Sequence, residues 1–184
     1  MSKTNRLLLA TSYIGFLTVG LFGPIYAIFV KKIGGDILEA GASYGLFAIV
    51  SGIMILTLGR TTFFQKNLRL LVVIGFGLFT VGDLAYLFIQ NPPQLFILQI
   101  FLGISEGFLE PAWDGLFSAN LTEEQSVRFW AIWAGGKDIA MGAGALAGGA
   151  LVAAYSFTAL FILLALLNAA GTIIVSRILW VKDK

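Results

Sequence analysis

Three acidic residues, Glu106, Glu110 and Asp114, are spaced four residues apart within an otherwise apolar segment. On an α-helix such residues are offset by only about 40° around the axis and about 6 Å along it, so their carboxyl groups form one stripe. A charge at the centre of a bilayer costs about 2.5 to 3.5 kcal/mol, so the stripe must face protein or water rather than lipid. The chemistry open to such a stripe is proton exchange or the binding of a cation.

Two outcomes follow for unpaired acids inside a membrane: some carry a proton, or a cation occupies the site. We therefore expect Glu106 and Glu110 to exchange protons and to contact a cationic or amphipathic substrate. Tyr26 and Trp113 are expected to supply aromatic surface for it. Lys137, at a depth comparable to that of Glu106, can neutralise one carboxylate.

A purely structural interpretation of the same charges stays open. Glu106 and Lys137 would then form a plain ion pair between helices. Asp114 and Arg128 would tie helix ends together at the cytoplasmic face. Asp83, a further acid within an apolar segment, would also have only a structural role.

The elements that carry these residues are membrane helices. Of the 184 residues, 58% are hydrophobic and 12% are charged, and the mean hydropathy of +0.91 exceeds that of soluble domains. Cysteine and histidine are both absent, which leaves no disulfide framework, no thiolate or imidazole metal site and no histidine-activated nucleophile. We expect no cofactor, no metal and no enzymatic activity, and the scattered basic residues offer no nucleic-acid surface.

Apolar runs long enough to cross the bilayer recur about every 30 residues. The runs are continuous, which excludes the alternating pattern of a β-barrel. We predict an all-α membrane protein with six transmembrane helices, at 7–30, 38–58, 68–89, 95–117, 127–155 and 157–179. Capping pairs are predicted to open the second and fifth helices, and a capping residue the fourth: Asp36 with Glu39, Thr122 with Gln125, and Asn91 before Pro92.

The basic residues indicate the orientation. Cytoplasmic loops of membrane proteins carry an excess of Lys and Arg, and here only Lys31 and Lys32 fall on the side opposite the N-terminus. Both termini are therefore predicted to be cytoplasmic, in a prokaryotic inner or plasma membrane. The side of the termini receives Lys3, Arg6, Arg60, Lys66, Arg69, Arg128, Arg177, Lys182 and Lys184.

An internal repeat relates the first and fourth helices. Gly20 precedes Pro24 by four residues, and Gly107 precedes Pro111 in the same way, at an offset of 87 residues. Proline removes the hydrogen bond to the carbonyl four residues back, so each helix should bend there, with the glycine making room for the ring. A period of three helices predicts two inverted repeats, about 7–89 and 92–179, within one six-helix domain of residues 1–184. The alternative is chance.

Small residues recur at spacings that let helices approach closely. Gly103 lies four residues before Gly107, and Gly144 lies four residues before Gly148, which Gly149 follows. We predict close helix packing at these glycines, and a gating hinge is the alternative.

Three stretches within 98–149 carry a family resemblance: Leu-Gly-Ile-Ser-Glu-Gly at 102–107, Thr-Glu-Glu at 122–124 followed by Arg128, and Gly-Ala-Leu-Ala-Gly-Gly at 144–149. They are similar to the fourth helix, the loop before helix five and the Gly-Pro-x-x-Gly-Gly motif of the major facilitator superfamily, so the chain resembles that family's N-terminal six-helix half. There are departures from the family pattern. Ala145 replaces the motif proline, the loop at 59–67 lacks the acidic residue of the family signature, and Gln99 stands where the family often has Arg.

The resemblance implies a secondary transporter whose first and fourth helices line a central cavity. Because family members typically have twelve helices, we expect two copies to form a parallel homodimer about an axis along the membrane normal. The dimer would carry a small molecule by alternating access, coupled to protons. The alternatives are an inactive or truncated half of a twelve-helix transporter, or a cation-selective pore. A membrane enzyme is disfavoured because no nucleophile with a base is visible.

Overall fold

The computed structural model describes residues 1–181, and every regular element in that range is helical. Lys182 and Lys184, which contributed to the predicted orientation, lie outside the described residues. In chain order the elements are α1 (Lys3–Phe22), η1 (Gly23–Ile25), α2 (Tyr26–Lys32), α3 (Ile37–Leu58), α4 (Thr62–Lys66), α5 (Leu68–Ala85), η2 (Tyr86–Phe88), α6 (Pro92–Ala119), α7 (Glu123–Ala154), α8 (Phe157–Ser176) and η3 (Arg177–Leu179).

Six helical segments within residues 1–181 are long and apolar enough to cross a membrane, which confirms the predicted number of spans. The first span combines α1, η1 and α2, the third ends in η2 and the sixth ends in η3. The spans are Lys3–Lys32, Ile37–Leu58, Leu68–Phe88, Pro92–Ala119, Glu123–Ala154 and Phe157–Leu179.

Polar side chains open two of the spans as the sequence predicts. The Asp36 carboxylate accepts a hydrogen bond from the Glu39 backbone N–H (2.9 Å), and the Glu39 carboxylate accepts one from the Asp36 N–H (3.0 Å), forming a complete capping box. Asn91 caps α6 by accepting from the Gln94 N–H at 3.1 Å. The capping pair predicted for α7 is wrong, because Thr122 precedes the helix without a side-chain cap and its backbone carbonyl accepts from the Gln125 N–H instead.

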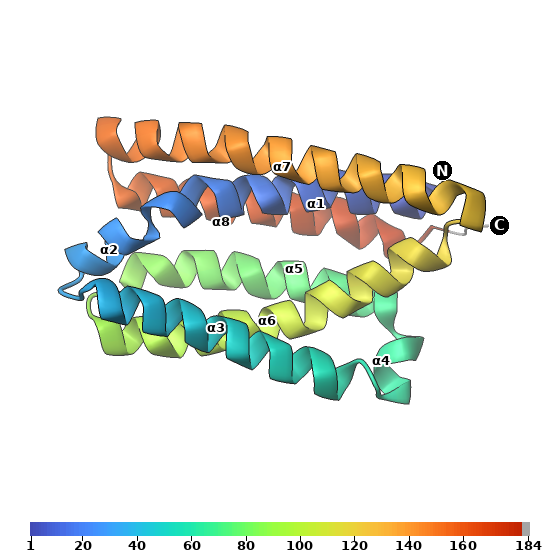
Figure 1. Cartoon of the computed structure of the whole chain (residues 1–184), viewed down its shortest axis with the longest axis horizontal. Coiled ribbons are helices and arrows are strands. Elements are labelled where there is room, and N and C mark those ends of the chain that lie inside the picture. Colours follow the sequence, from blue (N-terminus) through green and yellow to red (C-terminus); the bar gives the residue numbers. More distant parts are fainter. Residues whose placement is uncertain (182–184) are drawn as a thin grey trace.

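The six spans form an open arc. Taken in the order α3, α6, α5, α8, α1, α7, each helix packs mainly against the next, so α3 and α7 are the two ends of the arc. These two helices are also the least buried spans of the described chain. Figure 1 shows α7 along one edge of the bundle, next to α1, and α3 along the other, next to α6. The arc is therefore open between α3 and α7.

The first and the last described helical turns lie at the same end of the bundle. The start of α1, the short helix α4 and the turn between α6 and α7 lie together at that end in Figure 1. The final helical turn, η3, packs against α1 and α5 there. Arg69 of α5 adds to this packing of η3, because its guanidinium donates to the backbone carbonyls of Ile178 and Val181.

The two prolines have different effects on their helices. The first span is divided next to Pro24, where α1 ends at Phe22 and η1 intervenes before α2. Pro111 lies inside α6 without dividing it, and Figure 1 shows α6 changing direction along its length. The neighbouring glycines contact other helices: a Cβ on Gly20 would overlap the Met141 backbone of α7, and one on Gly107 would overlap Met54 of α3.

The other glycines of the sequence patterns differ from one another. A Cβ on Gly103 would lie 2.7 Å from the Phe47 carbonyl oxygen of α3, which is too close for any side chain. Gly144 and Gly148 lie against the backbone of α1, with Leu17 and Leu21 as their respective neighbours. Gly149 makes no such approach, since a Cβ there would meet no atom of the described chain within 4 Å.

Candidate functional site

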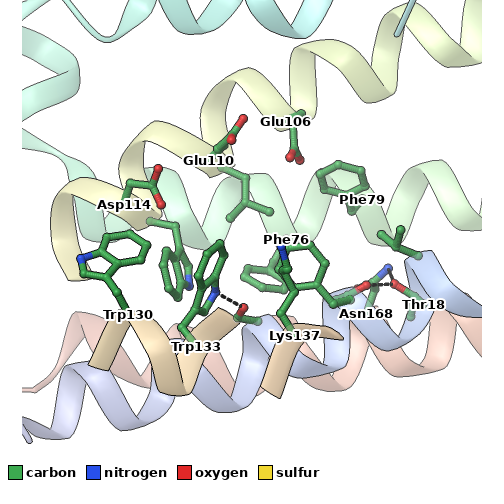
Figure 2. A pocket seen from close by; sticks show the side chains of 16 residues that line it. Thr18, Phe76, Phe79, Glu106, Glu110, Asp114, Trp130, Trp133, Lys137 and Asn168 are labelled. Atoms are coloured by element: carbon green, nitrogen blue, oxygen red, sulfur yellow. Dashed lines mark hydrogen bonds between the residues drawn. The ribbon is translucent and has the colours of Figure 1, made fainter. Parts of the chain in front are cut away.

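A cavity of about 580 Å³ lies on the inner side of the arc. Residues from α1, α5, α6, α7 and α8 form its walls. This volume falls in the range of small-molecule sites, about 300 to 1,000 Å³. Of the residues that the sequence singles out, the cavity brings together Glu106, Glu110, Trp113, Asp114 and Lys137 (Figure 2).

The three carboxyl groups lie along the α6 wall of this cavity. Glu106 and Asp114 are half-buried, and Glu110 is exposed. None of the three has a hydrogen-bond donor or an ion-pair partner among residues 1–181. In that same part of the chain, Asn5 Oδ1 is the only buried side-chain polar atom without a partner. The oxygens of the acidic stripe are therefore accessible to water and are not sealed against their own bundle.

Lys137 does not form the ion pair with Glu106 that the sequence suggested. Its ammonium lies 3.6 Å from the carboxylate of Asp138 and stands over the rings of Trp133 and Phe16. Neighbouring helical residues are about 100° apart, but the long lysine side chain bends back along α7 far enough to reach Asp138. In the described chain the acidic stripe is thus left without a neutralising cation, and Asp114 has no ion pair with Arg128.

Three tryptophans form the wall next to Asp114. Trp113 of α6 lies 5.5 Å from Trp133 and 6.3 Å from Trp130, both of α7, measured between ring centroids. Trp113 Nε1 donates to the Leu8 carbonyl oxygen at 3.3 Å, which links α6 to α1. Trp133 Nε1 donates to Ser12 Oγ at 2.9 Å. Both of these indole N–H groups are therefore satisfied. The Trp113 ring is itself packed away, since the residue is 6% exposed and stacks on Phe117, so the half-buried Trp130 and Trp133 offer the ring surface for contact with a ligand.

A buried polar group lies just behind the cavity. Asp83 of α5 is 7% exposed, and its carboxylate accepts a hydrogen bond from Asn168 Nδ2 of α8 at 2.6 Å. The same amide nitrogen lies 3.4 Å from Thr18 Oγ1 of α1. Asn168 and Thr18 line the cavity, as Figure 2 shows. This network joins three helices behind the site, and an acid there without a donor would be costly.

Tyr26 is not brought to the acidic stripe. It lies in α2, beyond the break at Pro24, and its hydroxyl lies 2.7 Å from Ser43 Oγ. Gln99 Nε2 donates to Tyr26 Oη at 2.7 Å and to Tyr86 Oη at 3.2 Å. Gln99, which replaces the family's basic residue, therefore ties α2, α6 and η2 together and does not face the cavity.

Phe16, Trp130 and Trp133 also line the cavity, although the sequence pattern did not single them out for it. A signal for two of them is present, because Trp130 and Trp133 lie seven and four residues before Lys137 and so share its helical face. Phe16 carries no comparable signal, since it lies in a uniformly apolar helix.

Comparison with known proteins gives consistent matches. The family model described as Major Facilitator Superfamily matches residues 8–184. The chain is 29% identical over 174 residues to "Multidrug resistance protein MdtG" of Serratia proteamaculans (strain 568), covering 89% of this chain and 41% of that protein. It is 30% identical over 166 residues to the protein of the same name from Yersinia enterocolitica, covering 86% and 40%. The chain thus spans about two fifths of the length of the curated relatives it matches.

Proposed function

The chain belongs to the Major Facilitator Superfamily, and from that premise we propose that it forms half of a proton-coupled transporter for cationic or amphipathic small molecules. Transport would proceed by alternating access, with the cavity of the arc as part of the substrate site. We further propose that the two three-helix repeats run in opposite senses and that both termini are cytoplasmic.

One observation carries this proposal: an unpaired, water-accessible acidic stripe faces aromatic rings across a cavity of drug-like size. Carboxylates that lack a fixed cation can take up a proton or a cationic ligand, and the two compete for the same charge. Such competition can couple substrate transport to proton movement, because binding of the substrate at a carboxylate displaces the proton from it. The name of the relatives, which refers to multidrug resistance, supports a broad range of organic substrates.

The second half of the transporter is proposed to be another copy of the chain. Each arc ends in α3 on one side and α7 on the other, and both helices expose large apolar side chains. A two-fold axis along the membrane normal would bring α3 of one copy against α7 of the other at both seams. The two inner faces would then enclose one central cavity.

A flux assay tests the proposed activity. The purified 184-residue chain is reconstituted into liposomes, and uptake of tetraphenylphosphonium is followed with and without an imposed pH gradient. We expect the gradient to drive uptake well above that of protein-free liposomes. Uptake equal to the protein-free control would contradict transport by this chain, and ion conductance at channel rates would indicate a pore instead.

Cross-linking tests the proposed pairing, and it is clean because the chain contains no cysteine. Tyr44 of α3 and Leu146 of α7 are 63% and 81% exposed and lie at similar depths, about 10 to 12 Å from the helix ends nearest to them. We expect a variant with cysteine at both positions to form covalent dimers with a short bifunctional thiol reagent.

The matched control joins Tyr44 to an exposed residue on the back of the arc. Leu166 of α8 is 63% exposed, and the proposed dimer keeps it away from the seam. Cysteines at Tyr44 and Leu166 should therefore give few dimers. Equal yields from the two pairs would contradict the α3 to α7 arrangement.

A further inference from the structure

The ammonium group of Lys137 lies against two aromatic rings inside the cavity. Its Nζ is 5.1 Å from the ring centroid of Trp133 and 5.6 Å from that of Phe16. Both distances fall within about 6 Å, the range of cation–π attraction. The lysine ammonium thus occupies a position over these rings that an ammonium group of a ligand could also occupy.

The two rings are fixed in place by their surroundings. Phe16 of α1 and Trp133 of α7 meet edge to face, with centroids 6.0 Å apart and planes at 72°. The indole is anchored by its hydrogen bond to Ser12 Oγ, and Ser12 is only 6% exposed. Because Ser12 and Phe16 lie four residues apart on α1, anchor and ring share one helical face. The aromatic pair therefore does not depend on Lys137 for its geometry.

Lys137 itself is held weakly. Within residues 1–181 its ion-pair partner is Asp138, whose side chain is 74% exposed, and such solvent-screened pairs contribute little. The lysine side chain is 28% exposed and has a flexible four-carbon stem. It can therefore leave the rings while its charge stays close to Asp138.

The opposite wall makes the same place attractive to a foreign cation. Glu106, Glu110 and Asp114 lie on α6, across the cavity from the residues that α1 and α7 contribute (Figure 2). A ligand cation on the aromatic pair is not tethered to α7, so it is free to move toward these carboxylates as well. Lys137 forms no ion pair with any of the three among the described residues and is limited to the rings and the exposed Asp138.

From this geometry we propose that Phe16 and Trp133 form a subsite for an organic ammonium, and that Lys137 occupies it as a tethered competitor which a substrate must displace. The inference rests on the cationic substrate of the proposed function, and it assigns that cation's position. It also makes Lys137 a specificity-determining residue, since cations that bind the rings weakly do not displace it.

Equilibrium binding of radiolabelled tetraethylammonium to the purified chain in lipid nanodiscs tests this inference. We expect Lys137→Met to bind the probe about tenfold more tightly than the wild type, because the rings become free. Lys137→Arg, which keeps a cation over the rings, should retain the wild-type affinity. Phe16→Leu should weaken binding and remove most of the gain from Lys137→Met in the double variant.

The double variant separates the subsite from a general charge effect. If Lys137→Met tightens binding equally with and without Phe16, the lysine acts only through its charge and the inference is overturned. Binding that is unchanged by Lys137→Met, or absent from all variants, also overturns it. Elution as a single folded species in size-exclusion chromatography controls for misfolding. Binding needs no proton gradient. If the variants bind the probe as expected but the chain does not transport, the result would count against the proposed function alone.

Discussion

Glu106→Gln and Glu110→Gln should each abolish the stimulation of tetraphenylphosphonium uptake by a pH gradient, a loss on the order of tenfold in the driven rate. Glutamine keeps nearly the volume of glutamate but can neither bind nor release a proton. Both carboxyl groups lie in the cavity, and among the described residues neither has a hydrogen-bond donor or an ion-pair partner, so each is open to exchange protons with water. Of the two, Glu106 is the more enclosed.

The pH profile distinguishes coupling from a general loss of activity. In Glu106→Gln, exchange of labelled for unlabelled substrate without a gradient should continue, because exchange requires no net proton release. The other charged groups of the cavity are Glu110 and Asp114 on α6 and Lys137 on α7.

The matched control is Glu123→Gln, which makes the same chemical change at an exposed residue in the first turn of α7, outside the cavity. It should keep wild-type uptake and pH dependence. If both cavity variants also retain the wild-type pH dependence, proton coupling through these acids is excluded.

Gly148→Ala should severely destabilise the protein, whereas Gly149→Ala should not. A Cβ on Gly148 would overlap the carbonyl oxygen and the Cα of Leu21, and backbone atoms of α1 can move only if the two helices separate. A Cβ on Gly149 would meet no described atom within 4 Å. Overpacking of this kind costs about 1 to 3 kcal/mol and more when the obstacle cannot yield.

The two substitutions form a matched pair, since both replace glycine by alanine in the same helix, one residue apart. Alanine favours a helix interior over glycine by up to about 1 kcal/mol, and this gain applies equally to both. Thermal unfolding in detergent, followed by the loss of the monodisperse elution peak, is the measurement. Gly149→Ala should match or exceed the wild-type melting temperature, and Gly148→Ala should fall well below it. Equal temperatures would mean that α1 and α7 are not in backbone contact.

The spans were predictable because the cost of leaving backbone polar groups unpaired in lipid fixes helix length and type. The acidic stripe was predictable for a similar reason, since the pitch of one helix decides which of its residues share a face. Which residues share a face of a single helix could therefore be predicted from the sequence. The sequence placed four candidate residues on one helical segment, and all four line the cavity in the structure: Glu106, Glu110, Trp113 and Asp114.

Contacts between helices were not predictable in the same way. Tyr26 lies beyond a break in its helix, and that short break decides which residues its hydroxyl meets. Lys137 has a long side chain that can reach several partners. Its depth in the membrane therefore could not show whether it contacts Glu106, Asp138 or the aromatic rings. Gly148 and Gly149 belong to the same glycine-rich stretch of the sequence. Which of the two contacts α1 depends on how α7 is rotated against α1.

The location of the start of α1 and of η3 at one end of the bundle has a consequence for how such proteins could become longer in evolution. An even number of crossings returns the chain to the side from which it started, near α1. Duplication of the coding sequence in tandem would therefore yield a single polypeptide whose second unit inserts with the same polarity as its first. No crossing would have to be gained or lost.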